Sequence, residues 1–217
     1  MNYFVTDIDN TIADTRNRLR RSLEEVDRVE VYEETADRYG GFGDYLDGEE
    51  EEAFWSLFLS NRFLHLDRPA PGAEEFLQKI RDEGVEIVYL TGRHDEAGDS
   101  MRSGTESWLE DNGFPSPDRS GVKLFMKPRR KMDDRKFKLA KLRDEFSEKS
   151  SPDDVIGIGD HPNDALVYNR VGIRPILLDW LGLFSNQELQ NSVSGVKIVE
   201  DWQGLEREFY GSENRIQ

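Results

Sequence analysis

Short apolar runs with strand character alternate with helical stretches along most of the chain, and this alternation constrains the fold more than any other feature of the sequence. The strand-like runs cover residues 3–7, 85–90, 122–126, 154–158, 175–178 and 196–199. Apolar residues with helical spacing occupy residues 73–83, 104–112, 134–146 and 163–171. Strands and helices that alternate in this way form right-handed βαβ units. We therefore expect an α/β fold with a parallel sheet that carries helices on both faces.

The stretch from residue 16 to residue 68 departs from this alternation. It is rich in Glu and Arg and shows helical rather than strand spacing, with a glycine-punctuated break at residues 39–48. We interpret it as a small helical insert that leaves the sheet after its first strand. Residues 1–15 and 69–217 are then expected to form the sheet-containing core.

Two features inside the insert have simple structural interpretations. The acidic run at residues 48–52 is typical of a solvated helix start. The aromatic residues Phe54, Trp55 and Phe58 are expected to form the core of the insert rather than a ligand-stacking surface.

Composition and charge exclude several classes of function. The 217 residues include no cysteine, which rules out disulfides, thiolate metal sites and cysteine nucleophiles. The formal net charge of -16 disfavours binding to a nucleic-acid backbone or to an anionic membrane. The sequence also lacks an apolar run of the roughly 20 residues that span a bilayer. We expect a soluble, cytoplasmic protein.

Pairs of carboxylates follow two of the predicted strands. Asp7 and Asp9 come at the end of the first run, and Asp160 and Asp164 follow the fourth. Parallel sheets bind ligands beyond the carboxyl ends of their strands, so the four side chains should meet at one edge. Clustered carboxylates repel one another unless a cation lies between them, and Mg²⁺ prefers oxygen ligands of this kind. For Asp164, the alternative is an acid that only stabilises a helix N-terminus.

A third polar group follows the second predicted strand, where Thr91, Gly92 and Arg93 stand in sequence. A hydroxyl, a backbone freed by glycine and a guanidinium together suit a phosphate group. On its own such a turn is common, so its significance depends on the carboxylates.

The order of these residues resembles the four motifs of the haloacid dehalogenase superfamily. The matching elements are Asp-x-Asp-x-Thr from Asp7 to Thr11, then Thr-Gly-Arg, a lysine-bearing helix and Gly-Asp-x-x-x-Asp from Gly159 to Asp164. The resemblance implies a Rossmann-like core, a cap domain at about residues 16–68, bound Mg²⁺ and a phosphoaspartyl intermediate.

The resemblance also implies a role for each residue of the motifs. Asp7 would be the nucleophile and Asp9 the general acid/base, with Thr91 and Lys138 as further catalytic groups. The implied substrate-binding residues are Thr11, Gly92, Arg93 and Lys127. The implied metal ligands are Asp7, Asp9 through its backbone carbonyl, Asp160 and Asp164.

A finer pattern resembles the phosphatase domain of bacterial and phage polynucleotide kinase/phosphatases. It consists of Arg102, Thr105, Trp108-Leu109, Met126-Lys127-Pro128 and Phe137-Lys138. In that subgroup the lysine of the third motif would be Lys138. Many other members place this lysine in a Lys-Pro pair, which would be Lys127. We favour Lys138.

The function predicted from the sequence is therefore that of a Mg²⁺-dependent phosphomonoesterase acting on a small phosphate ester or a nucleotide. The alternative substrate is the 3′-phosphate of a polynucleotide, which the net charge disfavours. A dehalogenase would not need the second acid at Asp9, whereas a phosphomutase would also use both acids. A non-catalytic phosphate-binding or regulatory module of the same fold is the alternative from another class.

Overall fold

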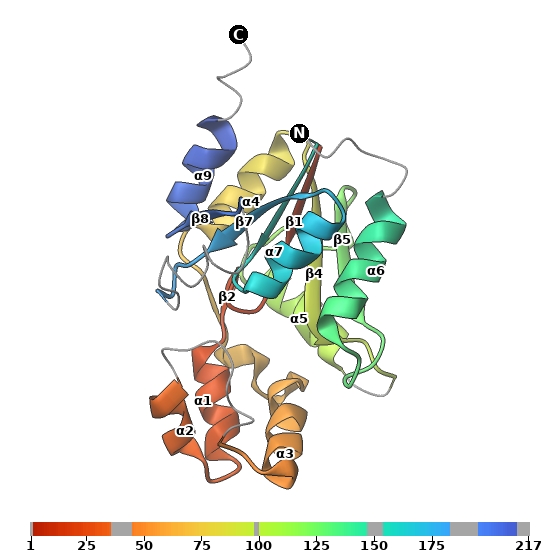
Figure 1. Cartoon of the computed structure of the whole chain (residues 1–217). Helices are drawn as coiled ribbons and strands as arrows, with labels where there is room; N and C mark the ends of the chain where they lie inside the picture. Colours follow the sequence, from red (N-terminus) through yellow and green to blue (C-terminus); the bar gives the residue numbers. More distant parts are fainter. Residues whose placement is uncertain (1, 36–44, 98–99, 147–153, 183–194, 212–217) are drawn as a thin grey trace.

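A six-stranded parallel sheet forms the centre of the molecule (Figure 1). The computed structural model describes residues 2–35, 45–97, 100–146, 154–182 and 195–211. The strand order is β5-β4-β1-β6-β7-β8. The strands are β1 (Tyr3–Thr6), β4 (Glu86–His94), β5 (Val122–Lys127), β6 (Val155–Gly159), β7 (Arg174–Leu178) and β8 (Lys197–Val199). This arrangement confirms the α/β fold and all six predicted strands.

Helices cover both faces of the sheet because alternate strand residues point to opposite sides. Phe4 and Ile87 belong to one large buried cluster, whereas their neighbours Val5 and Val88 belong to another. The first cluster packs beneath α4 (Ala73–Asp82), α5 (Met101–Asp111) and α9 (Trp202–Gly211). The second packs beneath α6 (Asp134–Phe146) and α7 (Pro162–Arg170). Helices α4 to α7 confirm the four predicted helices to within about one turn.

The insert consists of helices that lie beyond one end of the sheet (Figure 1). They are α1 (Arg16–Glu24), α2 (Val29–Thr35), α3 (Gly48–Phe58) and the 3₁₀ helix η2 (Asn61–Leu66). The chain leaves and returns through a two-stranded antiparallel ladder of β2 (Ala13–Asp14) and β3 (Arg68–Pro69). Most of the predicted break at residues 39–48 lies outside the described residues.

The insert has its own small hydrophobic core, which includes Leu23, Val31 and Phe54. Trp55 and Phe58 pack against this core while remaining partly exposed. The acidic run starts α3 as expected, with Asp47 as the N-cap of a capping box. The assignment of residues 16–68 as a cap domain remains our proposal. Among the described residues, none of the helices has the length and apolar character needed to cross a membrane.

Strand β4 continues further than its apolar run suggested. It extends to His94, so that Thr91, Gly92 and Arg93 lie within the strand rather than in a turn after it. Its pairing with β5 shifts register between Thr91 and His94. The carboxyl ends of β1, β4 and β6 lie side by side, which brings the sequence motifs to one edge of the sheet.

Candidate active site

The loop after β1 carries Asp7 and Asp9 and is held by its own backbone. The carbonyl of Ile8 accepts hydrogen bonds from the backbone N–H groups of residues 11, 12 and 13. Asn10 adopts a positive φ of 55°, a conformation that asparagine tolerates better than most residues. The indole N–H of Trp180 donates to the carbonyl of Asn10 at 2.7 Å. The loop therefore fixes where its two acids point.

Three buried carboxylates meet at this edge of the sheet. Asp7 follows β1, Asp160 follows β6, and Asp164 lies in the first turn of α7. One oxygen from each lies within 4.8 Å of one from each of the others. A Cβ atom at Gly159 would lie 2.6 Å from the Asp164 side chain, so glycine is required for this approach. The side chain of Asp9 does not belong to this group.

Lys138 supplies the positive charge inside this acidic group. From α6, its Nζ lies 2.8 Å from Asp7 Oδ2, 2.8 Å from Asp164 Oδ1 and 3.4 Å from Asp134 Oδ2. Lys127 makes no such contact with Asp7. Of the two candidate lysines, Lys138 is thus the one that contacts Asp7, and its assignment to the third motif stays a prediction.

The charges of the cluster do not balance. Burial raises the pKa of Asp7 well above its usual value, and Asp164 and Asp160 add to this effect while Lys138 opposes it. Lys138 contacts two of the three carboxylates, those of Asp7 and Asp164, and every acidic donor is a hard oxygen atom. Mg²⁺ prefers this donor chemistry, so Asp7, Asp160 and Asp164 fit a site for a divalent cation.

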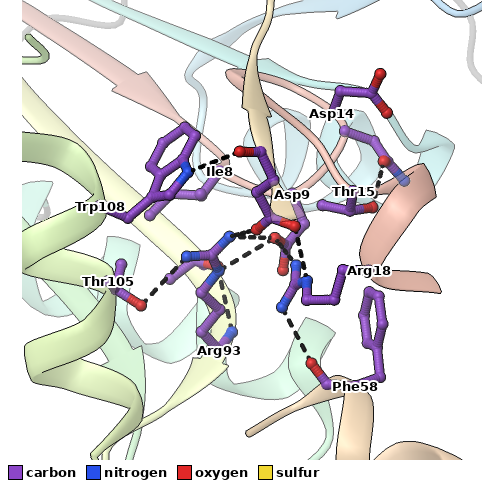
Figure 2. Close-up of polar contacts among 12 residues, drawn as sticks. Ile8, Asp9, Asp14, Thr15, Arg18, Phe58, Arg93, Thr105 and Trp108 are labelled. Atoms are coloured by element: carbon purple, nitrogen blue, oxygen red, sulfur yellow. Dashed lines mark hydrogen bonds and ion pairs between the residues drawn. The ribbon is translucent and has the colours of Figure 1, made fainter. Parts of the chain in front are cut away.

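Asp9 belongs to a second group, in which it contacts two arginines (Figure 2). Arg18 Nη2 donates to Asp9 Oδ1 at 2.5 Å, and Arg93 donates to the same oxygen through Nη2 at 2.7 Å and Nε at 3.1 Å. Both arginine side chains are fully buried. Burial would raise the pKa of Asp9, but the two guanidinium groups outweigh it and hold the pKa far below its usual range.

Asp67, at the end of the insert, completes this second group. It lies 2.8 Å from Arg93 Nη2 and 3.0 Å from Arg18 Nε. Burial raises the pKa of Asp67 to about 6, although both arginines act to lower it. The indole N–H of Trp108 donates to the Asp67 carbonyl, and Arg93 also donates to Thr105 (Figure 2). Two acids and two arginines therefore balance in charge. We call Asp9, Arg18, Asp67 and Arg93 the arginine cluster.

Three of the predicted site residues make polar contacts within the protein. Thr11 donates to Asp160 at 3.3 Å, and the hydroxyl of Thr91 accepts the backbone N–H of Arg93. Thr11, Thr91 and Arg93 are fully buried, and none of them lines the cavity at Asp7. Thr11 therefore contacts Asp160 and Arg93 contacts Asp9, while their predicted roles in substrate binding stay predictions. Thr91 likewise supports Arg93 in this structure.

A cavity of about 360 Å³ opens above the three carboxylates. Its core-side lining includes Asp7, Asp9, Gly92, Lys127, Lys138, Asp160, His161 and Asp164, and the insert contributes Trp55 and Leu59. A Cβ atom at Gly92 would lie 2.8 Å from Asp134 Oδ1, so a larger residue there would displace the Asp134 carboxylate. The imidazole of His94 is buried and contacts the Leu59 carbonyl, which joins core to insert. The insert therefore covers the candidate active site.

Sequence reasoning missed Arg18 and Asp67. Arg18 belongs to the charged helix α1, where an arginine is expected to be exposed to solvent. Its side chain is nevertheless fully buried. A signal did exist, because Arg18 is three to four residues from Thr15 and Ser22, which are also buried, and these mark one face of α1. Asp67 carried no comparable signal.

Similar solved structures share this fold over almost their whole length. A protein of Clostridium acetobutylicum described as a predicted phosphatase matches with a TM-score of 0.68 and 19% identity, over 97% of this chain and 98% of its own. A haloacid dehalogenase-like family hydrolase of Streptococcus pneumoniae matches with a TM-score of 0.65 and 13% identity, over 97% and 98%. CbbY from Rhodobacter sphaeroides, in complex with phosphate, matches with a TM-score of 0.62 and 15% identity, over 95% and 99%.

The chain therefore has the fold of the haloacid dehalogenase-like hydrolases. A Bacillus cereus protein whose name proposes that it is a nucleotidase is 30% identical over 118 residues. The match spans 52% of this chain and 59% of the Bacillus cereus protein. No family model matches the chain.

Proposed function

We propose that this protein is a Mg²⁺-dependent phosphomonoesterase that forms a phosphoaspartyl intermediate on Asp7. The observation that carries the proposal is the position of Lys138, whose ammonium group joins Asp7 to Asp164 inside a group of three carboxylates. The shared fold and the nucleotidase name of the Bacillus cereus relative support it.

Asp7 is oriented for attack by contacts to both of its carboxylate oxygens. Oδ1 accepts the backbone N–H of Ile8 at 2.7 Å, and Oδ2 contacts Lys138. In the first step an Asp7 oxygen attacks phosphorus, and the bond from phosphorus to the leaving oxygen breaks. Asp7, Asp160, Asp164 and the backbone carbonyl of Asp9 would hold Mg²⁺, which supplies charge neutralisation for the phosphoryl oxygens when bound. Lys138 provides a fixed positive charge beside the same oxygens.

Asp9 would give a proton to the leaving oxygen and later take one from the water that releases phosphate from Asp7. Its side chain is 21% exposed and lines the cavity, so it can reach both positions. The arginine cluster favours the ionised carboxylate, which is the form required for the second step. The first step requires a protonated Asp9, and hence weaker contact with Arg18 and Arg93.

The substrate that this site favours is a small phosphate ester or a nucleotide. The cavity of about 360 Å³ suits a ligand of modest size, and the net charge of -16 disfavours a polynucleotide. The insert residues Trp55 and Leu59 cover the side from which the leaving group must project. A polynucleotide 3′-phosphate is the second candidate, favoured by the sequence resemblance of Lys138 and its neighbours.

Release of phosphate from p-nitrophenyl phosphate tests the reaction class. We expect turnover with Mg²⁺, none in excess chelator, and none above background for Asp7→Asn, since an amide cannot form the acyl phosphate. A panel of phosphorylated metabolites, nucleotides and 3′-phosphorylated oligonucleotides then separates the substrates. Full activity in excess chelator would contradict the proposal, and so would turnover by Asp7→Asn.

A further inference from the structure

A second cavity adjoins the one above Asp7 and shares part of its lining. This neighbour, of about 280 Å³, is lined by Glu52, Trp55, Leu59, Lys127, Arg130 and Lys131. Trp55, Leu59 and Lys127 line both cavities. The two cavities therefore adjoin, and we call them together the exit groove. A leaving group attached to phosphorus at Asp7 would extend along it.

Lys127 is the most unusual residue of the exit groove. Its side chain is only 7% exposed, and its ammonium group has no hydrogen bond or ion pair among the described residues. Burial lowers the pKa of Lys127, while Asp134 acts in the opposite direction. A buried cation is costly unless it is paired, so this position is suited to an anionic group from a ligand.

The other basic residues of the exit groove are already paired. Arg130 Nη2 lies 2.6 Å from Glu52 Oε1, and Lys131 Nζ lies 3.0 Å from Glu52 Oε2. These contacts join the insert helix α3 to the segment that follows β5. Glu52 and Lys131 are both exposed, so solvent screens this pair at the rim. Lys127 is therefore the basic residue of the groove that an anion would satisfy.

The wall provided by the insert is apolar and aromatic. Trp55 is partly exposed, its indole N–H donates to Glu51, and its ring lies edge-on to Phe54 at 4.9 Å and to Phe58 at 5.8 Å between centroids. These contacts fix the orientation of the ring without covering it completely. An aromatic surface that faces a cationic side chain suits a planar ring joined to a negatively charged group.

We propose that the exit groove binds a nucleotide leaving group that carries a second phosphate, with Lys127 on that phosphate and Trp55 against the base. This inference rests on the proposed function, because it assumes that the scissile phosphate lies at Asp7. The shared ligand chemistry is a terminal phosphomonoester and a neighbouring phosphate on one nucleoside. A free nucleoside bisphosphate and the end of a nucleic-acid strand both provide it.

Calorimetric binding to the full-length Asp7→Asn variant with Mg²⁺ tests the inference without turnover. The probes are adenosine 3′,5′-bisphosphate, the 3′- and 5′-monophosphates of adenosine, and fructose 1,6-bisphosphate. We expect the adenosine bisphosphate to bind about tenfold or more tightly than either monophosphate, as one charge-assisted contact allows. Equal affinities would overturn the proposal.

Lys127→Met in the same background should remove the advantage of the bisphosphate and leave the monophosphates within about twofold, because Lys127 is assigned to the second phosphate alone. Lys136→Met is the matched control, since it removes the same charge from an exposed position of α6. An equal loss of affinity for all four probes would contradict the assignment of Lys127 to the second phosphate, because Lys127 would then contact the scissile phosphate.

Trp55→Leu should weaken the adenosine ligands by about tenfold, as expected for the loss of one stacked base, and spare fructose 1,6-bisphosphate. Trp55→Phe keeps an aromatic surface and should recover most of the affinity, which guards against a folding defect in the first variant. Equal effects of Trp55→Leu on nucleotide and sugar ligands would contradict base stacking.

A dinucleotide that ends in a 3′-phosphate separates the two sources. Tighter binding of the dinucleotide would assign the groove to a strand end, and tighter binding of the bisphosphate would assign it to a free nucleotide. Failure of the proposed function gives a different pattern, namely a bisphosphate preference without any turnover of p-nitrophenyl phosphate by the unmodified protein. Turnover of p-nitrophenyl phosphate without a preference for the bisphosphate would overturn only the proposal for the exit groove.

Discussion

Two acidic clusters lie beside one another in the candidate active site and differ in their charge balance. Lys138 contacts Asp7 and Asp164 within a group of three carboxylates that also includes Asp160, and burial raises the pKa of Asp7. In the arginine cluster, two carboxylates face two guanidinium groups, and the pKa of Asp9 is lowered.

The difference indicates which cluster can accept a cation. A divalent ion would relieve the repulsion among the carboxylates around Asp7, whereas the arginine cluster already has an opposite charge for each acid. We infer that the first cluster is completed by a ligand, and that the second holds the insert and Asp9 in place. The following predictions test this contrast, starting with the largest expected effect.

Asp7→Asn should abolish turnover, because the nucleophile is lost. In the presence of chelator, the same change should leave the free energy of unfolding unchanged or raised, because it removes one charge from an unbalanced buried group. Phosphate release and denaturant unfolding measure the two effects. A clear loss of stability in chelator would show that the carboxylates around Asp7 are already balanced without a cation.

Lys138→Met should lower kcat by at least about a hundredfold, on the scale of one lost charge-stabilising donor in a shielded site. Lys127→Met should instead mainly raise KM for a substrate with a second phosphate, such as adenosine 3′,5′-bisphosphate, because its ammonium group lies in the exit groove and does not contact Asp7. Steady-state kinetics of both variants on one substrate decides between them. The opposite ranking would transfer the third motif to the Lys-Pro pair and favour the small phosphate ester as substrate.

Arg18→Met should lower the free energy of unfolding by about 3 to 5 kcal/mol, the range for breaking a buried ion pair from one side. Arg20→Met on the same helix is the matched control, and should cost about 0.5 kcal/mol or less because that side chain is exposed. The double variant with Arg18→Met and Asp67→Asn should lose less free energy of unfolding than the sum of the losses in the two single variants. Additive losses would show that Arg18 and Asp67 do not act as a unit.

Asp67 should make a small and pH-dependent contribution to stability. Burial raises its pKa from the usual 3.8 to about 6, so the folded protein keeps a proton that the unfolded chain releases. The stability of the unmodified protein should therefore fall relative to that of Asp67→Asn as pH rises from about 4 to about 6. Denaturant unfolding of both proteins across this interval measures the difference. If the unmodified protein instead became more stable relative to Asp67→Asn as pH rises, the upward shift in the pKa of Asp67 would be contradicted.

The sheet and the group of carboxylates around Asp7 could be predicted because their signals are local. Each strand is a continuous apolar run, and Asp7 and Asp160 immediately follow such runs. Parallel strands then bring these ends together without further information. Lys138 could be placed through its resemblance to a known motif, and its contact with Asp7 spans 131 residues.

The arginine cluster could not be predicted from local patterns. Arg93 was expected to bind phosphate, because a guanidinium after a strand suits that role, and its contacts with Asp9 and Asp67 were not foreseen. Arg18 belongs to a helix rich in arginine, and only the packing of the insert against the core identifies which of these side chains is buried. Such pairs depend on the tertiary arrangement of two separate segments.

Titration calorimetry with Mg²⁺ tests the contrast between the clusters most directly. The unmodified protein and Asp67→Asn should each bind one Mg²⁺ per chain with similar affinity, because no side chain of the arginine cluster is assigned to the metal. Asp160→Asn should lose this binding, because it removes a ligand oxygen from the unbalanced cluster. Unchanged Mg²⁺ affinity in Asp160→Asn, or its loss in Asp67→Asn, would contradict the account.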